Sequence, residues 1–281
     1  MIKSNVILSV LVFFCTIFFV ACVSNTPDKL NISFHNSPSG FDVILTEKDN
    51  CKFIFCYAKD DDFYNDVDDE LSQLNTENPI NLAVCNYSDF SSACISSLIR
   101  NYPIDTIFLP TPITTSEHDK FVTLKRLFNS SNISYKVVNL SEFIDDSFSV
   151  RLFNPMRQKS TDSSALSFVI TFDNYSFGFL LGNETDQKIS ASLINMALSN
   201  NISTMQYAVN LDFLAIIPKN KPNESVLDLL TANNLYVSKY TEFVLESIYD
   251  NLPLTTVYTD KTYENLSLSV TENNLLSITT D

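Results

Sequence analysis

The side chains that could do chemistry in this sequence are few and scattered. Only two of its 281 residues are histidines, His35 and His118, which excludes a metal centre built from several histidines. A Ser-His-Asp triad could combine His118 and Asp119 with a serine. Ser37 and Ser116 are the candidates, but no G-x-S-x-G nucleophile elbow supports either. Such combinations arise by chance in a serine-rich chain, so we expect His118 to be an exposed residue at the start of a helix.

The composition excludes several other classes of protein. The three glycines, Gly40, Gly178 and Gly182, are too few and too far apart for a P-loop or a G-x-G-x-x-G fingerprint. The chain has 18 Lys and Arg against 33 Asp and Glu, a formal net charge of −15. A nucleic-acid binder needs a basic surface that neutralises phosphates, so we expect no direct contact with nucleic acid.

An acidic run, DDDFYNDVDDE (60–70), is the densest cluster of carboxylates. It could bind Ca²⁺, but it lacks the glycine and the spacing of an EF-hand loop. We expect instead a solvated helix N-terminus, where carboxylates interact favourably with the helix dipole. Val67, Leu71 and Leu74 follow at helical spacing.

The N-terminus has the pattern of an export signal. Lys3 precedes an apolar run of about 15 residues, which is short for a membrane span and typical of a signal peptide. The run ends in Phe-Val-Ala-Cys, which resembles a bacterial lipobox with phenylalanine where leucine is usual. We therefore predict a signal peptide over 1–21, a lipid-modified Cys22, a polar tether over 22–30 and a single domain over 31–281. The alternative is an uncleaved N-terminal anchor.

Four cysteines lie in the predicted domain, Cys51, Cys56, Cys85 and Cys94. No C-x-x-C pair is present, which excludes a zinc knuckle or a thioredoxin-like motif. In an exported domain four thiols allow three pairings. Cys56 and Cys85 both end apolar strands that could lie side by side, and they are our candidate disulfide. Four buried or free thiols are the alternative.

Apolar runs of strand length alternate with helical patterns along the rest of the chain. In the first half, strands are predicted over 31–35, 42–46, 52–57, 80–85, 106–109 and 135–140, with helices behind 60–62, from 91 or 92 and over 116–128. In the second half, strands are predicted over 148–153, 165–172, 176–181, 213–217, 255–259, 266–270 and 275–279, with helices over 186–200, 226–230 and 243–248. Two halves of similar build predict an α/β (α+β layered) fold, an αββα sandwich.

Several local sequences, in this order, resemble the exported metallo-β-lactamase-fold domain of ComEC-type DNA-uptake proteins. The resemblance runs from about residue 30 to 278 and is one of pattern and length. The matching segments are LNISFHNSPSGFDVIL (30–45), KFIFCYA (52–58), INLAVCNYSDFSSACISSLIRNYPIDTIFLP (80–110), LSFVITFDNYSFGFLLGNE (166–184), LDFLAIIPKNK (211–221) and LESIYDNLPLTTVYTDKTYENLSLSV (245–270). The resemblance implies a metallo-β-lactamase-like fold.

The resemblance also implies a two-metal centre of zinc or manganese, in which imidazoles and carboxylates hold ions that generate hydroxide. This sequence departs from the family at those ligands. Residues 86–91 stand where the family has H-x-D-x-D-H, and Asn183 stands in place of the bridging aspartate after Gly182. Lys219 and Asn220 replace the two histidines after Pro218. The degenerate positions are Cys56, Asn86, Ser88, Asp89, Phe90, Ser91, Asn183, Lys219 and Asn220.

Asn, Ser, Phe and Lys cannot assemble such a centre, so we expect no cofactor. An oxygen-only site for Ca²⁺ or Mg²⁺, built from Asp42, Asp89 and Asn183, is the functional alternative.

These observations predict an exported lipoprotein on the outer face of the bacterial cytoplasmic membrane. Its domain would be a non-catalytic pseudoenzyme that binds a ligand or a protein partner in the envelope. One alternative is a residual metal-dependent hydrolase of phosphodiesters or lactone-like substrates. Another, suggested by the family resemblance alone, is an accessory role in DNA uptake or envelope assembly.

Overall fold

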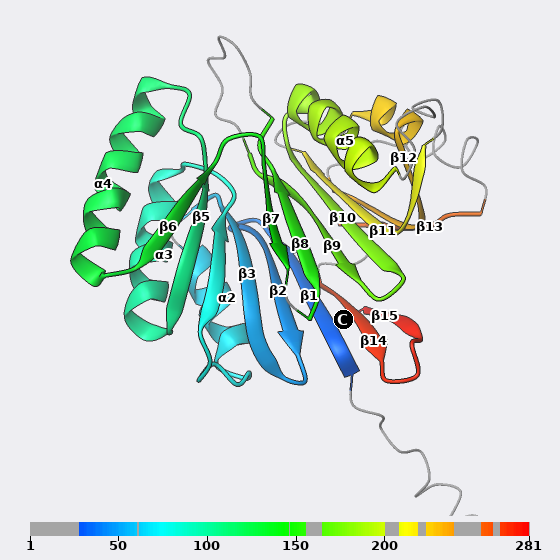
Figure 1. The fold of residues 1–281 in the computed structure, drawn as a ribbon, viewed down its shortest axis with the longest axis horizontal. Helices are drawn as coiled ribbons and strands as arrows, with labels where there is room; N and C mark the ends of the chain where they lie inside the picture. Colours follow the sequence, from blue (N-terminus) through cyan, green and yellow to red (C-terminus); the bar gives the residue numbers. More distant parts are fainter. Residues whose placement is uncertain are drawn as a thin grey trace, which may run out of the picture.

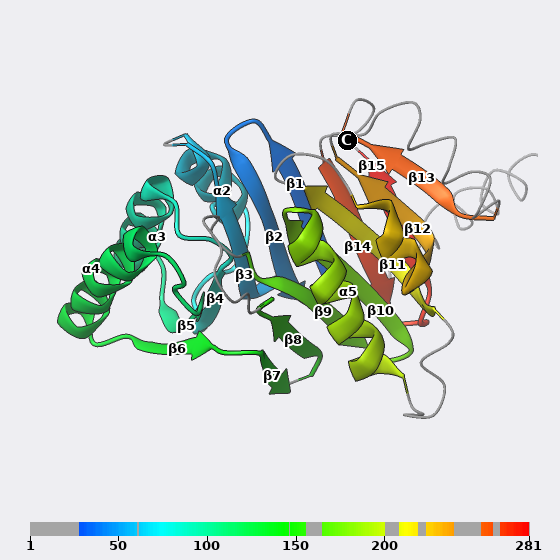
Figure 2. The ribbon, with the colours of Figure 1, turned by 90° about the horizontal axis from the view of Figure 1, so that it is seen from above.

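Two β-sheets lie face to face in this protein, with helices on the outer side of each (Figures 1 and 2). This four-layer architecture confirms the αββα sandwich predicted from the sequence. The computed structural model describes residues 28–60, 62–145, 147–155, 165–199, 208–218, 223–238, 254–260 and 265–280. The predicted signal peptide, Cys22, the predicted helix over 243–248, and Lys219 and Asn220 lie outside the described residues.

The first sheet has eight strands in the order β15-β14-β1-β2-β3-β4-β5-β6. Strands β1, β2 and β3 pair as antiparallel hairpins, and β3 to β6 run parallel. The last two strands of the chain extend the sheet beyond β1, so both ends of the domain share one edge. The strands are β1 (Asp28–Ser37), β2 (Gly40–Glu47), β3 (Asn50–Ala58), β4 (Ile80–Val84), β5 (Ile104–Pro110), β6 (Ser134–Val138), β14 (Asn265–Thr271) and β15 (Leu276–Thr280).

Three helices cover the outer face of this sheet: α2 (Phe63–Leu71), α3 (Asp89–Asn101) and α4 (Thr115–Ser131). Helix α2 buries Phe63, Val67 and Leu71, which recur every four residues and therefore share one face. Helix α4 begins with a capping box, in which the Thr114 side chain accepts from the Glu117 backbone N–H and the Glu117 carboxylate accepts from that of Thr114.

The second sheet has seven strands in the order β13-β12-β11-β10-β9-β8-β7. Helix α5 (Glu184–Leu198) and the short 3₁₀ helix η2 (Glu224–Asp228) cover its outer face. The predicted turn at Asp173 and Asn174 is confirmed, and Asp173 takes φ 51° there. The strands are β7 (Ser141–Asp145), β8 (Ser149–Phe153), β9 (Ser167–Phe172), β10 (Tyr175–Gly182), β11 (Val209–Pro218), β12 (Leu230–Val237) and β13 (Thr256–Thr259).

The core between the sheets is rich in phenylalanine. The Phe55 ring of β3 stacks on the Phe168 ring of β9, with centroids 3.8 Å apart, so the contact joins the two sheets. Phe168 stacks in turn on Phe179 of β10 at 4.6 Å. Aromatic side chains bury large apolar areas, and this cluster is the main link between the layers.

Three expectations differ from the structure. The segment predicted as a helix over 226–230 is the 3₁₀ helix η2, followed by β12, which the sequence pattern missed because the polar pair Asn233-Asn234 interrupts its apolar run. Strand β7 was missed for a similar reason, since it is short and half polar. Strand β1 begins at Asp28 and pairs with β14, so residues 28–30 belong to the sheet and not to the tether. In the described part of the chain, no helix combines the length and apolar character needed to cross a bilayer.

Candidate functional site

The residues at the predicted degenerate metal position are held by hydrogen bonds to the backbone. The Asn86 side-chain amide donates to the Ala58 carbonyl oxygen at 3.0 Å, and the Ser88 hydroxyl donates to the same oxygen at 3.1 Å. Both follow β4, where the chain passes from the sheet into α3. Helix α3 begins at Asp89, and the side chains of residues 89–91 are not described. Asn86 and Ser88 therefore fix the end of β4 against the end of β3.

Asn183 has a structural role at the neighbouring end of β10. It is the N-cap of α5, and its side-chain oxygen accepts from the Asp186 backbone N–H at 3.0 Å. Gly182 before it has φ +95°, and a Cβ at that position would lie 2.8 Å from Asp186 Oδ2. A glycine is required for both reasons.

Tyr57 of β3 connects the residues that follow β4 to those that follow β10. Burial, with Asp186 nearby, raises the pKa of the Tyr57 phenol to about 12, and a hydrogen bond between Tyr57 and Asn86 partly opposes the shift. The phenol is therefore a neutral hydrogen-bonding group near pH 7. Tyr57 thus connects Asn86 to Asp186, which Asn183 in turn contacts, and these residues form a structural network.

The described residues at this edge do not fit a zinc centre, because zinc is held by Cys, His, Asp or Glu side chains, whereas Asn86, Ser88 and Asn183 offer a neutral amide, a hydroxyl and a second amide. In the described ranges, no group of three or more His, Cys, Asp or Glu side chains is arranged to hold an ion. We therefore derive no chemistry from a metal at this edge.

The oxygen-only site predicted from Asp42, Asp89 and Asn183 is not assembled as expected. Asp42 and Ile44 are two residues apart on β2, so their side chains face the same side of the strand. Ile44 packs under the helices of the first sheet, and Asp42 therefore faces the same helix layer. Asn183 instead begins α5, on the outer side of the second sheet. Asp42 is 1% exposed and lies beside His35, so it is engaged elsewhere.

The predicted Cys56–Cys85 disulfide is also corrected. Both strands lie side by side, and the Cys85 backbone N–H donates to the Cys56 carbonyl oxygen at 2.7 Å. However, Cys56 packs in the apolar cluster under the helices, whereas Cys85 packs in the cluster between the sheets. Their side chains point to opposite faces of the first sheet, and all four described cysteines are buried and free.

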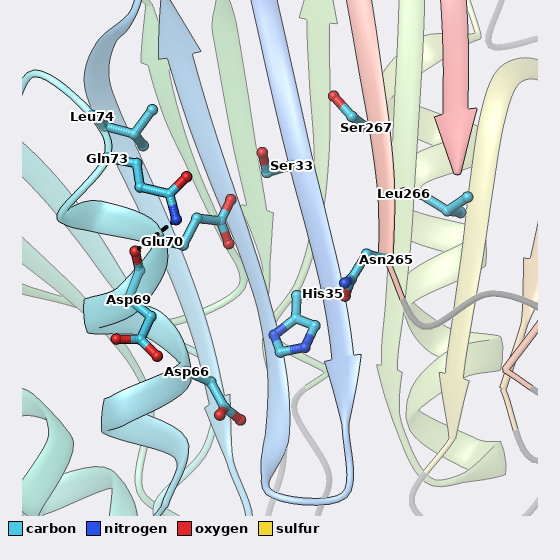
Figure 3. Close-up of a pocket in the computed structure, with 10 residues that line it drawn as sticks. All are labelled: Ser33, His35, Asp66, Asp69, Glu70, Gln73, Leu74, Asn265, Leu266 and Ser267. Atoms are coloured by element: carbon cyan, nitrogen blue, oxygen red, sulfur yellow. Dashed lines mark hydrogen bonds between the residues drawn. The ribbon is translucent and has the colours of Figure 1, made fainter. Parts of the chain in front are cut away.

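A polar pocket lies on the outer face of the first sheet, between α2 and the strands β1 and β14. It encloses about 400 Å³ and is drawn in Figure 3. The strands direct Ser33 and His35 of β1 and Asn265 and Ser267 of β14 into it, because every second side chain of a strand faces the same side, and Leu266 between them packs in the core between the sheets. Helix α2 and the turn after it supply mainly acidic side chains. The lining residues are Ser33, His35, Asp66, Asp69, Glu70, Gln73, Leu74, Asn265, Leu266 and Ser267.

His35 stands at the inner end of this pocket with a buried carboxylate behind it. Its Nδ1 lies 3.4 Å from Oδ2 of Asp42, and its side chain is 24% exposed. The neighbouring Asp42 carboxylate raises the pKa of His35, although burial opposes the shift. Burial in turn raises the pKa of Asp42, while His35 favours its ionised form. In Figure 3 the imidazole lies between Asp66 of α2 and Asn265 of β14.

Glu70 is the most perturbed acid that lines the pocket. Burial, with the Asp42 carboxylate nearby, raises the pKa of Glu70 to about 7, and a hydrogen bond to Ser33 and the charge of His35 oppose the shift. One turn earlier on α2, the Asp66 carboxylate accepts a hydrogen bond from the Ser37 hydroxyl at 2.9 Å. The run 60–70 is thus more than a solvated helix start, because its second half faces a pocket.

The pocket escaped the sequence analysis, although one signal was present. Ser37 pairs with Gly40 across the two-residue turn at Pro38 and Ser39, and this register places His35 opposite Asp42. No local signal shows that α2 turns Asp66 and Glu70 toward the same strands. His118 is exposed near the start of α4, as predicted.

The arrangement suits binding of a positively charged group. Three carboxylates line one wall, and Ser33, Asn265 and Ser267 add polar atoms on the opposite wall. Leu74 adds an apolar side chain. Because Glu70 titrates near neutral pH, the negative charge of the pocket increases as the pH rises through about 7.

No family model and no curated protein matches this sequence. Among solved structures, the chain is similar to CmlA, a diiron β-hydroxylase from Streptomyces venezuelae, with 10% identity and a TM-score of 0.52. The match covers 87% of this chain and 55% of CmlA, so the chain spans about half of that protein's length. This likeness shows a shared fold alone.

Two other similar structures have scores below 0.5. Igni18, a metallo hydrolase from the archaeon Ignicoccus hospitalis, is 9% identical with a TM-score of 0.47, over 84% of this chain and 98% of that one. A candidate zinc-dependent hydrolase of the metallo-β-lactamase superfamily from Thermotoga maritima is 11% identical with a TM-score of 0.30, over 82% of this chain and 97% of that one.

Proposed function

We propose that the protein is an exported, membrane-anchored lipoprotein whose domain binds a small cationic ligand without transforming it. The observation that carries the binding function is the pocket formed by α2, β1 and β14, with three carboxylates on one wall. The ligand class follows from that wall, because carboxylates accept charge-assisted hydrogen bonds from ammonium or guanidinium groups.

The non-catalytic part of the proposal rests on the residues at the ends of β3, β4 and β10. There the side chains of Asn86, Ser88 and Asn183 hold backbone groups and leave no described set of metal ligands. Because the chemistry of the resembled family depends on its metals, a domain of this fold without them is suited to binding.

Isothermal titration calorimetry with 1,4-diaminobutane tests the ligand class. We expect binding at pH 8 and weaker binding at pH 6, where Glu70 is largely protonated. The neutral analogue 1,4-butanediol and the anion succinate should not bind. Asp66→Asn and Glu70→Gln should each weaken diamine binding by roughly tenfold, the loss of one charge-assisted hydrogen bond. Glu77→Gln, at an exposed glutamate that does not line the pocket, is the matched control. Equal binding of the diol and the diamine would contradict the proposal.

Export and anchoring need a separate test, because they rest on the N-terminal sequence alone. The full chain would be expressed in a bacterium, and the mass of the mature N-terminus would be measured. We expect cleavage before Cys22 and a diacylglycerol on its sulfur, and Cys22→Ser should abolish both. An unprocessed N-terminus in the membrane fraction would indicate the uncleaved anchor instead.

A further inference from the structure

Two cysteines from different layers of the domain face each other. Cys56 of β3 points away from the second sheet, into the apolar cluster under the helices, and Cys94 of α3 belongs to the same cluster. They are 4% and 3% exposed. Cys94 is the neighbour that most affects the Cys56 thiol, and it raises the pKa of that thiol. Helix α3 packs directly on β3, so this contact lies at the helix–sheet interface.

The other two described cysteines have no such opposite partner. Cys85 lies on the opposite face of the sheet, in the cluster between the sheets. Cys51 is on β3 with Cys56, but five residues along a strand separate their α-carbons by about 16 Å, far beyond the span of a disulfide. The fold therefore favours the pairing of Cys56 with Cys94 over the other pairings of these cysteines.

We propose that Cys56 and Cys94 form an intramolecular disulfide that joins β3 to α3. The oxidant is a disulfide, either of a thiol–disulfide oxidoreductase or of a low-molecular-weight thiol. One cysteine thiolate attacks it and forms a mixed disulfide, and one oxidant thiol leaves. The second cysteine then attacks the protein sulfur of that mixed disulfide and releases the other oxidant thiol. One S–S bond forms, one breaks, and the two thiol protons end on the oxidant.

The surroundings of the pair set when this reaction takes place. The neighbouring Cys94, together with burial, raises the pKa of the Cys56 thiol, so Cys56 holds little reactive thiolate in the folded, reduced protein. Both sulfurs are also covered by the packed helix. The disulfide therefore forms while α3 docks on the sheet, and in the folded protein it is shielded from reductants.

Peptide mapping of the full chain tests this pairing. The protein would be refolded with a mixture of reduced and oxidised glutathione, denatured in the presence of N-ethylmaleimide to alkylate free thiols, and digested without reduction. We expect one linked peptide pair that contains Cys56 and Cys94, with Cys51 and Cys85 alkylated. Protein that is unfolded, reduced and refolded in the presence of reductant should melt about 5–10 °C lower than the oxidised protein, the effect of opening a loop of this size. Alkylation of both Cys56 and Cys94, or a Cys56–Cys85 link, would overturn the proposal.

Serine variants separate the link from general effects on folding. Cys85→Ser and Cys51→Ser should keep the linked pair and the dependence of the melting temperature on reductant. Cys94→Ser should lose both and leave Cys56 alkylated. If Cys94→Ser does not fold, the peptide map of the unmodified chain still decides, because it needs no variant. The pairing is independent of the ligand proposed for the pocket, so failure of one leaves the other standing.

Discussion

Replacing Glu70 by glutamine should stabilise the protein at alkaline pH and leave its stability at acid pH almost unchanged. The pKa of Glu70 is about 7 in the folded protein, against an ordinary value of 4.5, because the carboxyl is largely buried and lies near Asp42. Between these two pH values the folded chain binds more protons than the unfolded chain. The stability due to protonated Glu70 is therefore complete below pH 4.5 and is lost as the pH rises through about 7. Glutamine resembles the protonated acid and does not titrate.

The size of the effect follows from the shift in the pKa. A difference of about 2.5 units corresponds to roughly 3.4 kcal/mol of unfolding free energy when the titration is complete. The pocket is open to water on one side, which screens part of this energy. We therefore expect the unfolding free energy of Glu70→Gln to be about 1–3 kcal/mol higher than that of the unmodified protein at pH 8.5, and the two values to be equal near pH 4.5. The raised pKa values of His35 and Asp42 give both proteins a slope of the same sign, and the difference between the two curves measures Glu70 together with its interaction with His35.

Urea unfolding at half-unit steps from pH 4.5 to 8.5, at constant ionic strength, measures this difference. The slope of the free energy against urea should be the same for both proteins, since the variant exposes no additional surface. Glu77→Gln at an exposed position is the control, and its curve should follow that of the unmodified protein. Parallel curves for Glu70→Gln and the unmodified protein would refute the burial argument.

Three further substitutions test the packing and the caps that position the pocket. Gly40→Ala would place a Cβ against the Phe63 ring and 2.8 Å from the Tyr57 carbonyl oxygen, and should lower the unfolding free energy by about 1–3 kcal/mol in urea titrations. Thr114→Ala removes half of the capping box of α4 and should cost about 1 kcal/mol, whereas Thr114→Ser should cost less because the hydroxyl is kept. Phe168→Ala removes the ring that stacks on Phe55 across the sheets and should cost about 3–5 kcal/mol, measured by the same titrations; a loss below 1 kcal/mol would contradict its role in joining the layers.

Local patterns in the sequence predicted most of the elements. The apolar runs at 52–57 and 80–85 became β3 and β4, and the helical spacing of Val67 and Leu71 identified the buried face of α2. These features depend on residues that are close in the sequence, because a short stretch of consecutive residues shows the repeat of a strand or a helix. Strand β12 was missed for the same reason. It is buried through its neighbours in the sheet, while its own residues include several polar side chains.

The location of the degenerate metal position was also accessible from the sequence. The resemblance named Asn86 and Asn183 as positions that stand in place of metal ligands, and Tyr57 connects Asn86 to Asp186, whose backbone Asn183 caps. Their hydrogen-bond partners were not predicted, because a side chain that donates to a backbone carbonyl leaves no pattern in the sequence.

The sequence by itself determined the alternation of strands and helices, the acidic character of residues 60–70 and the register that sets His35 against Asp42. Tertiary structure decided everything that depends on how layers meet. The rotation of α2 about its axis turns Asp66 and Glu70 toward β1, and β14 reaches the same strand from more than 200 residues away. The docking of α3 selects Cys94 as the neighbour of Cys56. The physical reason is that these contacts are set by packing of large apolar surfaces between distant segments, which minimises exposed area over the whole domain and not over any one stretch of chain.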